Sequence, residues 1–171
     1  MTGFAETLPL AAKIWLSIGL ATSLFVVAVI DMKTLRIPDW LSLPLIAAGL
    51  LASALVAGAM PLDHAAGALG GFAVFAILGE VYFRLRGVDG LGLGDAKLFA
   101  AAGAWLGWQQ LPLVLLLATA GGLAQAVILQ KTGRTTPLAF GPWLAFGFLA
   151  VWLASVWVGS VWLASVWVLP F

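Results

Sequence analysis

The stretch from Leu98 to Gln130 contains no aspartate, glutamate, lysine or arginine. Across the whole chain of 171 residues, 63% are hydrophobic and only 9% are charged, against about 25% charged residues in soluble domains. A soluble globule of this size needs a polar shell, which so few charges cannot provide. The apolar surface must therefore face lipid, and we expect an all-α, polytopic membrane protein.

Two further features of the composition exclude whole classes of function. Eight basic and seven acidic side chains give a net charge of +1, which leaves no basic patch for binding nucleic acid. The chain has no cysteine, so disulfides, thiolate zinc sites and thiol nucleophiles are excluded. We expect no metal, no cofactor and no nucleic-acid partner, and we expect the lipid bilayer to surround the chain.

Uncharged runs predict about six transmembrane helices, because about 20 apolar residues in a helix cross the hydrocarbon core. Gln109, Gln110 and Pro112 interrupt the longest run, which therefore predicts two helices joined by a tight turn. The fourth helix, from Asp95 to Trp108, would be only about 21 Å long, shorter than the core. The expected segments are Ile14–Ile30, Trp40–Leu62, Ala65–Phe83, two helices within Leu98–Gln130, and a sixth from about Leu138 to Val158.

The basic residues test this count, because cytoplasmic loops next to membrane spans are enriched in lysine and arginine. With six spans, all the basic residues except Lys13 lie on one side of the membrane. If Leu98–Gln130 were a single span, this bias would disappear. We therefore predict that both termini face outward and that the three charged loops are cytoplasmic. The residues on the predicted cytoplasmic side are Lys33, Arg36, Arg84, Arg86, Lys97, Lys131 and Arg134.

The C-terminus contains an internal repeat, in which the sequence of residues 151–158 recurs at residues 161–168. Its tryptophans are five residues apart, a step of about 140° on a helix, so they form no single stripe. We interpret the repeat as a duplicated segment that extends the last helix to an aromatic interfacial end. The chain is therefore predicted to be one membrane domain over residues 1–171, with 159–171 as a tryptophan-rich tail.

Two aspartates are the main candidates for chemistry. Asp31 ends the first predicted span and Asp95 precedes the fourth, so both lie at the same membrane face. An ionisable group at this depth is costly and is by default a functional candidate. The helix N-terminus and Lys97 favour a negative charge on Asp95, whereas Asp31 has no such support. Two carboxyl groups in different environments suit general acid–base catalysis. Taken singly, Asp95 could instead cap a helix and Asp31 could be an interfacial residue.

Three segments of the chain resemble the type IV prepilin peptidases, which are intramembrane aspartyl proteases of the Gly-x-Gly-Asp type. The resemblance extends from about Ala12 to Val158 and preserves the order and spacing of the family's membrane domain. The segments are Ile30–Asp39 followed by Leu43-Pro44, Gly90–Leu98 continuing to Trp108, and Pro137–Trp143.

The resemblance implies a specific reaction. The family removes the basic leader of type IV prepilins and type II secretion pseudopilins at the cytoplasmic face of the bacterial inner membrane. Its catalytic aspartates correspond to Asp31 and Asp95. Many members also carry a cysteine-containing, zinc-associated domain linked to N-methylation. Because this chain has no cysteine, the resemblance supports leader cleavage and gives no support to N-methylation. The supporting motif residues are Pro38, Gly92, Gly94, Lys97, Gly141 and Pro142.

Several neighbouring residues have more than one interpretation. Lys97 either stabilises the ionised form of Asp95 or marks the interface. Asp39 is expected to cap the second helix, and His64 to be a loop residue on the outer side. Pro142 is expected to shape a backbone irregularity facing the site.

A rival hypothesis is a non-enzymatic membrane protein, either a small transporter or a secretion-system assembly factor. The aspartates would then relay protons or cations. The halves of the chain show no convincing similarity of the kind that favours a transporter. Both carboxylates also lie at one membrane face, whereas a relay across the bilayer needs them at different depths.

Overall fold

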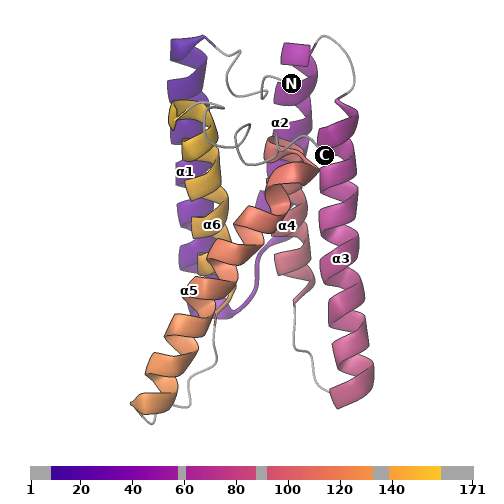
Figure 1. Cartoon of the computed structure of the whole chain (residues 1–171), viewed down its shortest axis with the longest axis vertical. Coiled ribbons are helices and arrows are strands. Elements are labelled where there is room, and N and C mark those ends of the chain that lie inside the picture. Colours follow the sequence, from indigo (N-terminus) through magenta and orange to yellow (C-terminus); the bar gives the residue numbers. More distant parts are fainter. Residues whose placement is uncertain (1–8, 58–60, 88–91, 133–138, 159–171) are drawn as a thin grey trace, which may run out of the picture.

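The computed structural model describes residues 9–57, 61–87, 92–132 and 139–158. All regular elements in these ranges are helices, which confirms the predicted all-α class (Figure 1). Their bounds are α1 Leu10–Thr34, α2 Asp39–Ala57, α3 Leu62–Arg86, α4 Leu93–Leu106, the short 3-10 helix η2 Trp108–Gln110, α5 Leu111–Lys131, α6 Gly141–Leu153, and the π-helical turn η3 Ala154–Val158.

The helices alternate in direction along the bundle. α1, α3 and α5 run downward in Figure 1, and α2, α4 and α6 run upward. We call the end at which α4 and α6 begin the lower end. The predicted break in the long uncharged run is confirmed, because η2 separates α4 from α5 at Trp108–Gln110. The six expected helices are therefore present.

Helix length separates two classes of helix. Within the part of the chain that the structure describes, four segments are long and apolar enough to cross a membrane: Leu10–Thr34, Asp39–Val56, Leu62–Leu85 and Trp108–Lys131. α4 has 14 residues and α6 has 13, fewer than the ~20 that a straight crossing needs. The fold is that of a multi-pass membrane protein in which the two short helices α4 and α6 pack among four long ones. At its upper end, α4 continues into η2 and α6 continues into η3.

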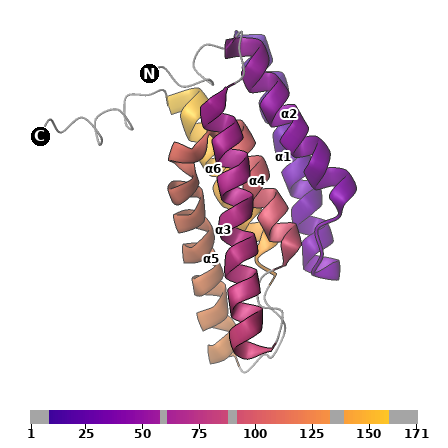
Figure 2. The ribbon, with the colours of Figure 1, turned by 90° about the vertical axis from the view of Figure 1, so that its right-hand side faces the viewer.

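α4 is the central helix of the bundle, and it packs against α2, α3 and α6 (Figure 2). Nearly every residue from Ala96 to Trp105 is buried. Small side chains allow this close packing: a Cβ added to Gly103 would lie 2.2 Å from the backbone of Gly67 on α3. Close backbone approach through small residues is the usual way in which membrane helices pack.

Tryptophan side chains join the neighbouring helices by hydrogen bonds. Trp105 on α4 donates from Nε1 to the backbone oxygen of Leu45 on α2, at 2.8 Å. Trp152 on α6 donates to Ser17 Oγ on α1, at 3.0 Å. Each indole thus buries a large apolar area while its N–H group keeps a partner. These bonds fix α2 and α1 against the short helices.

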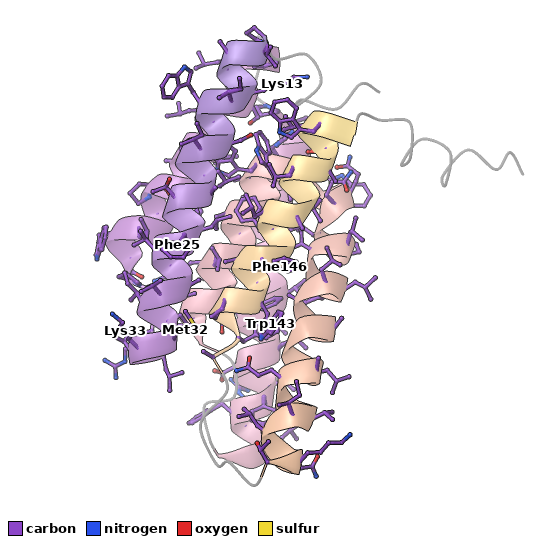
Figure 3. The ribbon with its side chains drawn as sticks, turned by 90° about the vertical axis from the view of Figure 1, so that its left-hand side faces the viewer. Lys13, Phe25, Met32, Lys33, Trp143 and Phe146 are labelled. Carbon is purple, nitrogen blue, oxygen red and sulfur yellow. The ribbon has the colours of Figure 1, made fainter. Side chains whose placement is uncertain are left out.

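The outer faces of α1 and α6 are apolar. Phe25, Met32 and Phe146 are exposed and project outward in Figure 3, where a membrane would contact them. The first copy of the C-terminal repeat forms the end of α6 and η3, with Trp152 buried and Trp157 exposed. The second copy, at 161–168, and the rest of the tail lie outside the described residues.

The basic residues gather at the lower end, as the count of six spans predicts. Lys33 lies there, and Lys13 lies at the opposite end of α1 (Figure 3). Helix bounds place the other described basic residues at the lower end as well, whereas Arg134 lies outside the described ranges. These residues are Arg36 after α1, Arg84 and Arg86 at the end of α3, Lys97 at the start of α4 and Lys131 at the end of α5.

Candidate active site

Asp31 lies in the last turn of α1 with only 5% of its surface exposed. Its Oδ2 accepts a hydrogen bond of 3.0 Å from the backbone N–H of Gly141. α1 ends at Thr34, and the next residue, Leu35, adopts a left-handed conformation with φ of 53° and donates its N–H to the Asp31 carbonyl. A buried carboxyl group is therefore held between the end of α1 and the start of α6.

Gly141 is a residue that this arrangement requires. A Cβ added there would lie 2.6 Å from Asp31 Oδ2 and 2.8 Å from its Cγ. Gly141 is also the first residue of α6, so its N–H group has no partner within the helix and is free to bind the carboxylate. The positive end of the α6 dipole faces Asp31. The expectation that Asp31 lacks electrostatic support was therefore wrong.

Pro142 follows in the first turn of α6, where a missing N–H group costs nothing. Phe140 and Gly141 lead directly into regular helix, and Trp143 and Leu144 both donate to the Phe140 carbonyl. The backbone irregularity expected at Pro142 is therefore absent. The fixed φ of proline suits a helix start, and the irregular turn of this segment lies at its other end, in η3.

Asp95 lies in the first turn of α4, and Gly92 is the residue that precedes the helix. The alternative that Asp95 is itself the helix cap was therefore wrong, since α4 begins two residues earlier. Its backbone N–H donates to the Gly92 carbonyl at 3.0 Å. A Cβ added to Gly92 would lie 3.8 Å from Asp95 Oδ2, an ordinary van der Waals distance, so the carboxyl group does not itself require a glycine there.

The structure brings Asp31 and Asp95 to the same end of the bundle, because α1 ends and α4 begins there. α6 contacts both α1 and α4 and so holds the two helices together. The Phe75 ring of α3 lies 4.5 Å from the Phe99 ring of α4 and 6.4 Å from the Phe140 ring, measured between centroids. Phe99 follows Asp95 by one helical turn and Phe140 directly precedes Gly141, so this aromatic cluster joins α3 and α4 to the start of α6.

Lys97 and Asp39 have a role that the sequence did not indicate. Lys97 Nζ donates to Asp39 Oδ1 at 2.5 Å, so Lys97 forms an ion pair with Asp39. Asp39 is the first residue of α2 and not the cap before it; the Pro38 carbonyl accepts from the N–H groups of Leu41 and Ser42. The ion pair joins residues that are 58 positions apart in sequence, and no local pattern could have revealed it.

Gly94 contributes through its missing side chain. A Cβ at this position would lie 2.9 Å from Ile37 Cβ and 3.2 Å from Ile37 N. Ile37 is buried and belongs to the segment between α1 and α2. The motif glycine before Asp95 therefore lets the α1–α2 connection pack directly against the start of α4.

His64 lies at the opposite end of the bundle from the two aspartates. It belongs to the first turn of α3, so the prediction of a loop residue was wrong: α3 already begins at Leu62, after Pro61. Its Nδ1 lies 3.0 Å from the Ala104 carbonyl near the end of α4. His64 thus fixes the far end of α4 against α3.

Comparison with known proteins identifies the chain's relatives. The type IV leader peptidase family matches residues 18–127, a range that includes Asp31 and Asp95. The curated relatives include three named prepilin leader peptidase/N-methyltransferase. The protein of Pectobacterium carotovorum subsp. carotovorum is 42% identical over 137 residues, covering 78% of this chain and 49% of that protein. That of Escherichia coli (strain K12) is 46% identical over 125 residues, covering 70% and 54%. That of Burkholderia pseudomallei (strain K96243) is 41% identical over 132 residues, covering 75% and 43%.

The chain spans about half the length of these curated relatives. No solved structure matches it. The family match covers most of the chain, including the end of α1, the start of α4 and the glycines that precede Asp95. The chain belongs to the type IV leader peptidase family.

Proposed function

We propose that this protein is an intramembrane aspartyl endopeptidase in which Asp31 and Asp95 form the catalytic pair. One observation carries the proposal: two carboxyl groups far apart in sequence lie at the same end of a membrane bundle, Asp31 in the last turn of α1 and Asp95 in the first turn of α4. Asp31 is buried and held by Gly141. Membership of a leader peptidase family supports the same assignment.

The proposed reaction is hydrolysis of a peptide bond by general acid–base catalysis. One carboxylate takes a proton from a water molecule, whose oxygen attacks the scissile carbonyl carbon. The other carboxyl group donates a proton toward the substrate and stabilises the tetrahedral intermediate. When the C–N bond breaks, the carboxyl group that took the proton from water gives it to the leaving nitrogen, and the other carboxylate takes back its proton as the new carboxyl product forms. The Gly141 N–H group binds Asp31 Oδ2, which leaves Asp31 Oδ1 free to contact the water.

The proposed substrate is a type IV prepilin or a related pseudopilin, by analogy with the relatives named prepilin leader peptidases. Its apolar stem would lie in the membrane and unwind near the cut, because a helical peptide bond is shielded by its own hydrogen bonds. The basic residues of the lower end support a cytoplasmic location for the site in the bacterial inner membrane.

The test is co-expression of the protein with a prepilin. Asp31→Asn and Asp95→Asn should each abolish leader removal while the variants remain folded and inserted. Asp63→Asn is the matched control, because Asp63 lies in the first turn of α3 at the opposite end of the bundle; it should cleave normally. Processing retained by either Asn variant would exclude the aspartyl mechanism, and loss of processing in the control would show that removing any carboxyl group is damaging.

A further inference from the structure

Two contacts join the α1–α2 connection and the first residue of α2 to the start of α4, and the α4 residues that make them lie on either side of Asp95 in the sequence. Ile37 packs against Gly94, with its backbone nitrogen 3.2 Å from the place of a Gly94 Cβ. Asp39 binds Lys97 at 2.5 Å, with side-chain exposures of 60% and 23%. We call these four residues, Ile37, Asp39, Gly94 and Lys97, the connector clamp.

The other end of the same segment holds Asp31. Leu35 has a positive φ of 53°, a conformation that residues with a Cβ rarely adopt, and it donates its N–H to the Asp31 carbonyl. The turn after Asp31 is therefore tight, and only residues 35–38 separate α1 from α2. A short segment with one end at Asp31 and the other fixed to α4 limits how far Asp31 and Asp95 can separate.

We infer that Asp39 and Lys97 are positioning residues of this site, whose ion pair closes the connector clamp and sets the separation of Asp31 and Asp95. The inference rests on the proposed function. A partly exposed ion pair contributes little to global stability. A displacement of about 1 Å between catalytic groups can nevertheless cost about 100-fold in rate. The pair should therefore affect catalysis far more than folding.

The test is a kinetic cycle on purified protein in detergent, with a synthetic prepilin peptide as substrate. Asp39→Asn and Lys97→Gln should each lower kcat by about tenfold or more, with KM and the melting temperature nearly unchanged. The double variant should be no worse than either single variant, because both remove the same interaction. Asp39→Glu should retain most of the activity. Glu80→Gln and Arg84→Gln break an exposed ion pair within α3 and serve as controls that should keep the normal kcat.

A reversible covalent link gives a second readout. The chain has no cysteine, so Asp39→Cys/Lys97→Cys can be joined by a short bis-methanethiosulfonate reagent without other reactions. The reduced double variant should have the low kcat of the neutral variants. Cross-linking should restore activity, and reduction should remove it again. Normal kcat in the single variants, additive losses in the double variant, or no recovery on cross-linking would each overturn the inference.

The inference can fail separately from the proposed function. If the unmodified protein cleaves no prepilin, the peptidase proposal fails, and cross-linking then decides on the clamp without activity. Asp31→Cys/Asp95→Cys should react with a narrow range of cross-linker lengths. Addition of Lys97→Gln should broaden that range, whereas addition of Arg84→Gln should not. An unchanged range with Lys97→Gln would overturn the connector clamp even in an inactive protein.

Discussion

At the scale of single residues, Gly141 combines two properties that the site needs at once. Its N–H group, unpaired at the start of α6, binds Asp31. Its missing side chain leaves room for the carboxyl group that it binds. Another residue could supply the N–H group, but its Cβ would occupy the space of the acceptor.

Gly141→Ala should therefore lower prepilin cleavage by about 10- to 100-fold, because the added methyl group would meet Asp31 Oδ2 at 2.6 Å and displace it. Folding should be little affected, since alanine is a better helix former than glycine. Gly70→Ala is the matched control: a Cβ there meets nothing within 4 Å. Cleavage assays and thermal melts of both variants check this. Equal activity of the two variants would show that the Gly141 contact does not matter for catalysis.

At the scale of helices, α4 depends on small residues for its place in the core. Gly103 faces Gly67, and the atoms that an added Cβ would meet, at 2.2 Å, are backbone atoms of α3. Backbone cannot rotate aside as a flexible side chain can. Any larger residue at Gly103 must therefore push α3 and α4 apart at this point, and the first turn of α4 carries Asp95.

Gly103→Val should destabilise the protein by about 2 kcal/mol, within the range of overpacked cores. It should also reduce prepilin cleavage. Denaturant or thermal unfolding in detergent measures the first effect. The control is Gly19→Val on α1, where a Cβ meets nothing within 4 Å; the same change in helix propensity occurs there without the clash. If the two variants are equally stable, the close packing of α3 and α4 does not limit stability.

The helices themselves could be predicted from the sequence, but their neighbours could not. Uncharged runs located the six helices, and Gln109, Gln110 and Pro112 located the break between α4 and α5, because both signals are local. The number of spans between Asp31 and Asp95 then placed both residues at the same end of the bundle. The bond from Gly141 to Asp31 and the Asp39–Lys97 pair depend on α6 packing against α1, and α2 against α4. The hydrophobic pattern within one helix does not indicate which other helix packs against it.

At the scale of the whole molecule, the distribution of charge bears on orientation. Lys33 and Lys13 mark opposite ends of α1 (Figure 3), and nearly all the other basic residues lie at the end of Lys33. Basic residues close to spans remain on the cytoplasmic side during insertion. The end that carries Asp31 and Asp95 should therefore face the cytoplasm, where a basic prepilin leader is located.

Single-cysteine variants test this orientation directly, because the chain has no cysteine of its own. In intact spheroplasts, a membrane-impermeant maleimide should label Lys13→Cys. It should label Lys33→Cys only after the membrane is permeabilised. Asp31 lies two residues before position 33 on α1, so the label reports the side on which the carboxyl pair lies. The reverse pattern would place Asp31 and Asp95 on the outer side, where a leader that remains in the cytoplasm cannot reach them, and the proposed substrate would then be excluded even if the two aspartates hydrolyse peptides.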